Sequence, residues 1–254
     1  MKEFLIEEIK KLPKFELKDI AIKEDGKYID NQYLKAVIEK GKPELILAIV
    51  SDKYKLVQFE DVFIPAIEKI DNIKAGVIDA YRGKAHLEVY PEGEEFIIDK
   101  DKRIGLVLKN SVDKAWAVRI SFAINSKNFP TVYLPSKIIK GMRKVHRGSV
   151  KVVEDFLNVI TQVKEAWKLI AGKLQSYSFK IDELDDFAKT TKIGKRIKKK
   201  IKKMCEEKDV TLWDVFIKVI DEISKRRFKS EVSKKEKLER ISNAIFNYAL
   251  ILNL

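Results

Sequence analysis

The central part of the sequence alternates between strand-sized apolar segments and tight turns, and this spacing constrains the fold more than any other feature. Turn-forming pieces such as Arg82-Gly83-Lys84 and Pro91-Glu92-Gly93 separate the segments. Links this short make consecutive strands antiparallel neighbours. The strand candidates are 74–81, 85–90, 94–98, 104–109, 116–125 and 131–134. The centre of the chain therefore predicts an antiparallel sheet.

The segment 116–125 has the clearest two-residue period. Trp116, Val118, Ile120, Phe122 and Ile124 fall on one face of the predicted strand, whereas Ala117, Arg119, Ser121, Ala123 and Asn125 fall on the other. This alternation predicts that one face packs on the core and the other stays polar.

Helical periodicity dominates the rest of the chain. An apolar stripe predicts a long amphipathic helix over 149–175 that covers the sheet, and residues 182–254 are all helical in pattern, with Thr211 as a helix cap. Before the centre, the pattern predicts helices at 1–12, 31–40 and 59–70 and strands at 44–50 and 54–58. The predicted fold is α+β: an antiparallel β-sheet backed by a long helix, with a core domain at 1–178 and a basic helical segment at 179–254.

Composition limits the setting of the protein. Apolar residues make up 45% of the 254 residues, which suffices for a core, and the longest apolar runs are strand-sized, so no membrane span is expected. A single cysteine, Cys205, fits a cytoplasmic protein without disulfides. Abundant Lys, Glu and Ile suit a thermophile, whose lysines serve surface ion pairs. Clustering of the charge is therefore more informative than its net value of +13.

Catalytic motifs are scarce. The phosphate-binding patterns GxxxxGK[ST] and GxGxxG are absent, so no nucleotide cofactor is expected. His86, His146 and Cys205 cannot build a zinc site of standard spacing, and neither a catalytic residue nor a metal ligand is assigned. The acidic groups 94–95, 99–101 and 182–186 leave a metal-dependent nuclease open as an alternative, because such enzymes need converging carboxylates.

Two acid-free basic segments are the strongest functional signal. The first, at 137–151, holds Lys137, Lys140, Arg143, Lys144, Arg147 and Lys151. The second, which we call the lysine block, is KTTKIGKRIKKKIKK at 189–203; its predicted site residues are Lys192, Lys195, Arg196, Lys198, Lys199, Lys200, Lys202 and Lys203. Such clusters predict a polyanion partner, most simply nucleic acid. Arg119 is expected to line the same groove, and Tyr133 to stack on a base.

Three pieces in order, SDKYKLVQFEDVF (51–63), KNSVDKAWAVRISF (109–122) and KVHRGSV (144–150), followed by TLWDVFIKVIDEIS (211–224), resemble the phage- and plasmid-borne family called domain of unknown function 932. The family has no settled activity. Its setting on mobile elements is similar to that of phage single-strand annealing proteins, which combine a small antiparallel sheet with a long helix, often form rings and lay DNA in a basic groove. The resemblance thus implies DNA binding and a homo-oligomer.

Together these patterns predict a nucleic-acid-binding protein without a cofactor, which binds and anneals single-stranded DNA in recombination, repair or mobile-element replication. The alternative is an interaction protein or defence inhibitor of a mobile element, whose basic surface meets an acidic protein. The second alternative is the metal-dependent nuclease.

Overall fold

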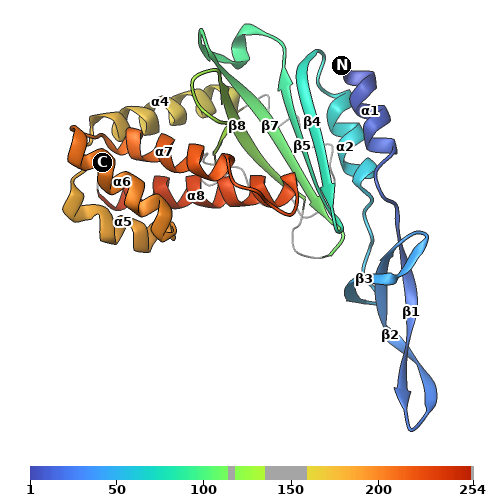
Figure 1. Cartoon of the computed structure of the whole chain (residues 1–254). Helices are drawn as coiled ribbons and strands as arrows, with labels where there is room; N and C mark the ends of the chain where they lie inside the picture. Colours follow the sequence, from blue (N-terminus) through green and yellow to red (C-terminus); the bar gives the residue numbers. More distant parts are fainter. Residues whose placement is uncertain (114–117, 135–158, 253–254) are drawn as a thin grey trace. The chain divides into compact units, whose positions relative to one another are not determined.

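The computed structural model describes residues 1–113, 118–134 and 159–252 and has two antiparallel sheets together with helices (Figure 1). The predicted α+β class is confirmed. The described residues form two compact units: the first unit holds 1–92, 107–113 and 118–120, and the second holds 93–106, 121–134 and 159–252. The domain boundary after residue 178 stays a prediction.

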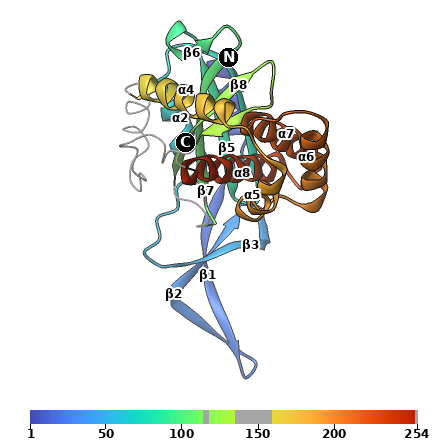
Figure 2. The same cartoon turned by 90° about the vertical axis from the view of Figure 1, so that its left-hand side faces the viewer.

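The first unit begins with helix α1 (Lys2–Lys10) and a three-stranded antiparallel sheet in the order β1 (Phe15–Glu24), β2 (Lys27–Glu39) and β3 (Lys42–Ser51). The turn between β1 and β2 is Asp25-Gly26, with φ of 47° and 78°. Positive φ at both turn residues gives the twist that a two-residue hairpin needs, and Asp-Gly favours it. Figures 1 and 2 show β1 and β2 as a long twisted ribbon.

The helix predicted at 31–40 is wrong, because these residues lie in β2 and its turn to β3. The pattern looked helical because Tyr33, Leu34, Val37 and Ile38 recur at helical spacing. Pairing with two neighbouring strands overrides this local preference, and Gly41, with φ of 82°, lies in the turn between β2 and β3. The strand predicted at 54–58 is also wrong, since no strand forms there, whereas the strand at 44–50 is confirmed as part of β3.

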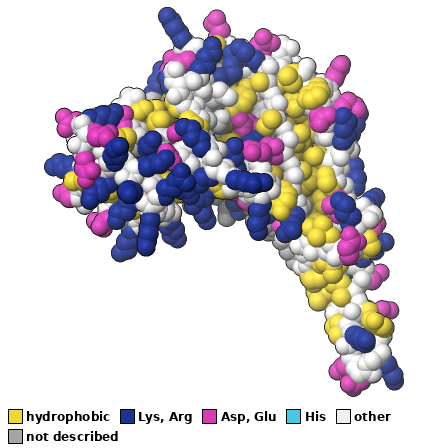
Figure 3. Space-filling model, in the orientation of Figure 1, with side chains coloured by type: hydrophobic (Ala, Val, Ile, Leu, Met, Phe, Trp, Pro, Cys, Tyr) yellow, Lys and Arg dark blue, Asp and Glu magenta, His cyan; other side chains and the backbone are white. Residues whose placement is uncertain are grey.

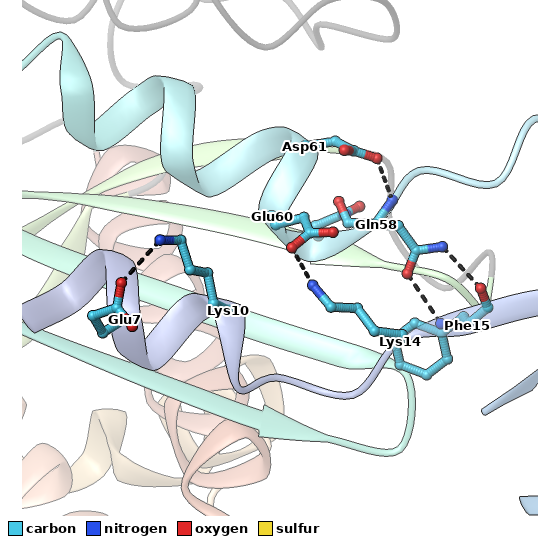
Figure 4. A network of polar contacts seen from close by, with 8 residues as sticks. Glu7, Lys10, Lys14, Phe15, Gln58, Glu60 and Asp61 are labelled. Atoms are coloured by element: carbon cyan, nitrogen blue, oxygen red, sulfur yellow. Dashed lines mark hydrogen bonds and ion pairs between the residues drawn. The ribbon is translucent and has the colours of Figure 1, made fainter. Parts of the chain in front are cut away.

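Helix α2 (Phe59–Glu68) follows the sheet and packs against α1. The side-chain amide of Gln58 accepts a hydrogen bond from Phe15 N–H (3.0 Å) and donates one to Phe15 C=O (2.9 Å), while Lys14 pairs with Glu60 (Figure 4). These contacts fix the start of β1 to the start of α2. The helices that precede and follow this sheet, α1 and α2, match the predicted helices at 1–12 and 59–70.

The second sheet has the order β4-β5-β7-β8-β9, with β6 on β7. Its strands are β4 (Ile73–Tyr81), β5 (Lys84–Pro91), β6 (Ile97–Asp99), β7 (Lys102–Ser111), β8 (Arg119–Ser126) and β9 (Val132–Leu134). The strands expected near 74–81, 85–90, 104–109 and 131–134 are confirmed. The segment 94–98 instead starts as a 3₁₀ turn, η1 (Glu94–Phe96). The polar face predicted for β8 is wrong in its middle, because Ser121 and Ala123 are as buried as Phe122.

The described chain after the second sheet is helical, as predicted: α4 (Ile160–Ser176), η3 (Ile181–Glu183), α5 (Leu184–Thr191), α6 (Lys195–Glu207), α7 (Leu212–Ser224) and α8 (Glu231–Ile251). The long helix expected at 149–175 is present as α4, and its residues before 159 lie outside the described ranges. Trp167 of α4 packs with Phe129 and Trp213, and α8 packs on β9. None of the described helices has the length and hydropathy of a membrane span.

Thr211 caps α7 as predicted. Its hydroxyl accepts a hydrogen bond from the Asp214 N–H (3.2 Å), and the Asp214 carboxylate accepts one from the Thr211 N–H (2.9 Å). This reciprocal arrangement satisfies two backbone donors at the helix start.

Two glycines allow a matched test of packing. A methyl group on Gly76 of β4 would lie 2.6 Å from the buried Leu5 side chain of α1 and 3.3 Å from the Glu88 carbonyl oxygen, whereas Gly172 of α4 has open space. We expect Gly76→Ala to destabilise the protein by about 1–3 kcal/mol because the buried Leu5 side chain must shift within a packed site. Gly172→Ala should stabilise it by about 0.5–1 kcal/mol through helix propensity. Thermal melts that rank the two variants in the opposite order would contradict the packing of α1 on β4.

Candidate nucleic-acid interface

Helices α6 and α7 form an antiparallel pair in the second unit. Ile197 and Ile201 of α6 are buried, and the Lys200 ammonium bonds the Glu222 carboxylate at 2.6 Å. Because Lys200 lies in the first half of α6 and Glu222 in the last turn of α7, the start of α6 lies beside the end of α7. The sequence dictates this pairing through the apolar stripe of α6, which leaves its lysines at the surface.

A basic groove lies where these two helix ends meet. It has a volume of about 720 Å³, within the range of ligand sites. Its lining comprises Arg196, Lys200, Glu222, Lys225, Arg226 and Arg227. Five of these six side chains are cationic, so the groove attracts anions. Figure 3 shows Lys and Arg side chains gathered over α5, α6 and α7, with acidic side chains among them.

Ion pairs divide the groove cations into two classes. Lys200 shares the Glu222 carboxylate with Lys218 (3.4 Å), and Lys225 pairs with Asp221 (2.6 Å). Within the described part of the chain, the three arginines of the groove have no acidic partner and are exposed. A guanidinium presents a planar set of donors that matches two phosphate oxygens. The arginines are therefore the groups best able to bind a phosphate here.

Helix α8 carries further cations within electrostatic range of Arg226. Burial lowers the pKa of Lys237, and the neighbouring charges of Arg240 and Arg226 lower it further. These like charges therefore lie near enough to disfavour one another, and an anion beside them would relieve that repulsion. The groove cations thus come from the start of α6 and the end of α7, and cations of α8 lie near Arg226.

The lysine block contains no acidic residue, but acidic side chains from other parts of the chain pair with several of its lysines. Lys198 pairs with Asp185 of α5, Lys200 with Glu222 of α7, Lys202 with Glu206 (3.8 Å) and Lys203 with Glu207 (3.4 Å). Among the described residues, four cations of the predicted site keep no acidic partner: Lys192, Lys195, Arg196 and Lys199, all exposed. The open charge of the block therefore lies in its first half, beside the groove.

Two of the remaining predicted site residues, Arg119 and Tyr133, are among the described residues. Lys137, Lys140, Arg143, Lys144, Arg147 and Lys151 are outside the described residues, and their role stays a prediction. Arg119 is exposed at the start of β8, in the first unit. Tyr133 of β9 is only 2% exposed, so its ring offers no face to a base.

Sequence reasoning missed Lys225, Arg226 and Arg227. The signal was present as the run Lys225-Arg226-Arg227-Phe228-Lys229 between two helical patterns, but this run is much shorter than the lysine block. A basic run at the end of a helix also suits the negative end of the helix dipole. That structural role and anion binding are compatible, because the arginine side chains remain exposed.

Three of the acidic residues considered for catalysis have local partners. Asp99 pairs with Lys102 (2.7 Å), Asp101 accepts from Ser126 (3.3 Å), and Glu183 accepts from the Tyr177 hydroxyl (2.6 Å). Burial, and then Glu206, raises the pKa of the Cys205 thiol, which opposes formation of a thiolate. Across the described ranges, no three His, Cys, Asp or Glu side chains gather closely enough to hold a metal ion.

Comparisons with models of known families, with curated proteins and with solved structures found no match for this chain. The resemblance to domain of unknown function 932 therefore stays a prediction.

The shared carboxylate of Glu222 gives a pH test. Hydrogen bonds from Lys200 and then Lys218 hold the pKa of Glu222 below its ordinary value of 4.5, against the opposing effect of burial. A folded-state pKa below the unfolded one means that the stabilisation is present above pH 4.5 and is lost as the pH falls through the lowered value. We expect Glu222→Gln to be less stable than the wild type at neutral pH, with the difference closing in acid. A difference in melting temperature that is constant from pH 7 to pH 3 would contradict this pairing.

Proposed function

We propose that the protein binds nucleic acid, with single-stranded DNA as the preferred ligand, through the basic groove of the second unit. The observation that carries the proposal is the cluster of Arg196, Arg226 and Arg227, exposed around one groove and without acidic partners in the described part of the chain. Binding of this kind needs no cofactor, because neutralised phosphates and released counterions supply the free energy.

The extent of the basic surface favours a polyanion over a single small anion. Lys192, which follows α5, and Lys195 and Lys199 of α6 are exposed cations near the start of α6, and Lys237 and Arg240 are cations of α8. One phosphate can contact only a few of these groups at a time. A chain of phosphates can contact the groove and these cations together, which makes affinity depend steeply on salt.

The aromatic residue Phe228 favours a single strand. It directly follows Arg227, precedes Lys229 and is partly exposed. Proteins that bind single strands combine cations for the backbone with aromatic side chains on which bases stack. Bases in a duplex are stacked on one another and are not available for this contact. Phe228 takes the role that the sequence had suggested for Tyr133.

The arginines give the first functional prediction. We expect Arg226→Ala with Arg227→Ala to weaken binding of a fluorescent oligonucleotide by about tenfold, because two cationic hydrogen-bond donors are removed from the groove. The slope of log affinity against log salt should fall by about one unit for each phosphate that the variant no longer neutralises. Fluorescence anisotropy over a salt series measures both quantities.

The matched control is Lys202→Ala with Lys203→Ala, which removes the same charge from the paired half of α6. It should change affinity much less than the arginine variant. Equal losses of affinity in the two variants would show that net charge alone drives binding, and an affinity that ignores salt would refute a phosphate site. Capture of an acidic host protein that survives nuclease treatment would favour the interaction-protein alternative.

Phe228 gives the second functional prediction. Phe228→Leu keeps an apolar side chain but removes the aromatic face, so we expect weaker binding to single-stranded DNA by about fivefold or more. Binding to a duplex of the same length should be nearly unchanged. Equal effects on both ligands would contradict base stacking at this position while leaving the arginine prediction intact.

A further inference from the structure

Strand β1 is an open edge of the three-stranded sheet. The sheet order is β1-β2-β3, so one side of β1 pairs with β2 and the other has no strand partner in the described chain. Open edges pair readily with strands of other chains. Where the register of the sheet shifts, the extra residues lie in β2 or β3 and not in β1. At the shift beside β1, Asp19 and Ile20 are adjacent, whereas their β2 partners Lys35 and Asn31 are four residues apart. The exposed edge of β1 is therefore regular.

The hydrogen bonds of Gln58 identify which β1 residues point outward. Phe15 uses both its N–H and its C=O for the Gln58 amide (Figure 4). The C=O of Lys14, in contrast, accepts a hydrogen bond from the Lys40 N–H on the β2 side. Backbone groups alternate in direction along a strand paired in the antiparallel sense. The outward backbone groups are therefore those of Leu17, Asp19, Ala21 and Lys23.

The sequence of this edge complements itself. Residues 18–24 read Lys-Asp-Ile-Ala-Ile-Lys-Glu. When two copies are placed antiparallel about Ala21, Lys18 faces Glu24, Asp19 faces Lys23 and Ile20 faces Ile22. In this placement the outward backbone groups of Asp19 in one copy face those of Lys23 in the other. The outward backbone groups of Ala21 face those of Ala21 in the second copy. This is the hydrogen-bonded register of an antiparallel ladder.

We propose that β1 pairs with β1 of a second copy of this chain, in this register, about a two-fold axis at Ala21. The pairing brings Ile20 of one copy beside Ile22 of the other, and Ile22 already lies opposite Ile29 of β2. The side chains of Ile22 and Ile29 are 53% and 51% exposed in a single copy. In the dimer, Ile20 of the second copy extends this row of apolar side chains across the new strand pair. Figure 3 shows hydrophobic side chains along this sheet.

Electrostatics identifies a second copy as the occupant. Residues 15–51 hold six lysines and seven acidic residues, although the whole chain has 52 basic and 39 acidic residues. Two copies of a strongly basic protein repel each other, and this nearly neutral sheet is where they can approach at least cost. A strand whose charges match their own reversed order selects itself over an unrelated edge.

A charge-swap experiment on the full chain tests the register. After nuclease treatment, size-exclusion chromatography with light scattering should show a dimer that forms as concentration rises. Lys23→Glu and Asp19→Lys should each raise the dimer Kd by about tenfold, since each places like charges opposite one another at two symmetric positions. The double variant Asp19→Lys with Lys23→Glu should restore dimerisation. Asp19 also pairs with Lys35 (2.6 Å), so circular dichroism melts accompany each variant.

Cysteine cross-linking provides an independent measurement. In a Cys205→Ser background, Ala21→Cys should form a covalent dimer on oxidation, because paired Cα atoms at the axis are about 5.5 Å apart, within disulfide range. The control Lys23→Cys places the two thiols roughly 13 Å apart along the strands and should cross-link poorly.

Each of three outcomes would overturn the proposal. A monomer at every soluble concentration, a double charge variant as weak as the single ones, or Lys23→Cys cross-linking as well as Ala21→Cys excludes this pairing. None of these results depends on DNA binding.

Discussion

The pairing of α6 with α7 determines which cations of these two helices have an acidic partner in the described chain. Ile197 and Ile201 bury one stripe of α6, and this fixes the lysines of the other faces relative to the acids of neighbouring helices. Glu222 forms ion pairs with Lys200 and Lys218, and Asp185 forms one with Lys198. These carboxylates pair with lysines, and the arginines at the groove have no acidic partner among the described residues.

The fold was predictable where local signals and tertiary pairing agree. Arg82-Gly83 marks the turn between β4 and β5, with positive φ at both residues, and Thr211 with Asp214 marks the start of α7. The prediction failed at 31–40, where a helical spacing of apolar residues competes with pairing to two strands remote in sequence. The Asp25-Gly26 turn, which favours a hairpin over a helix, was the local sign that could have corrected it.

The candidate site was predictable only in part, because a sequence shows which residues are charged but not which of them pair with opposite charges in the fold. The lysine block was visible as a run, but its partners Asp185 and Glu222 come from helices on either side and could not be assigned without coordinates. Ion pairs four residues apart, such as Lys203 with Glu207, could have been read from helical spacing. Arg226 and Arg227 were readable as a basic run, although their convergence with Arg196 needed the antiparallel arrangement of α6 and α7.

The charge of the chain is distributed in a way that links the two proposals. The β1–β2–β3 sheet is nearly neutral, so the excess of lysine and arginine lies in the remaining residues. A dimer through β1 would double the number of basic grooves without bringing additional like charge into the interface. A long strand of DNA that reached both grooves would bind the second one at a high effective concentration, whereas a short oligonucleotide would occupy one. Dimerisation would therefore raise affinity for long ligands and leave the intrinsic affinity of each groove unchanged, which separates the contribution of the sheet from that of the helices.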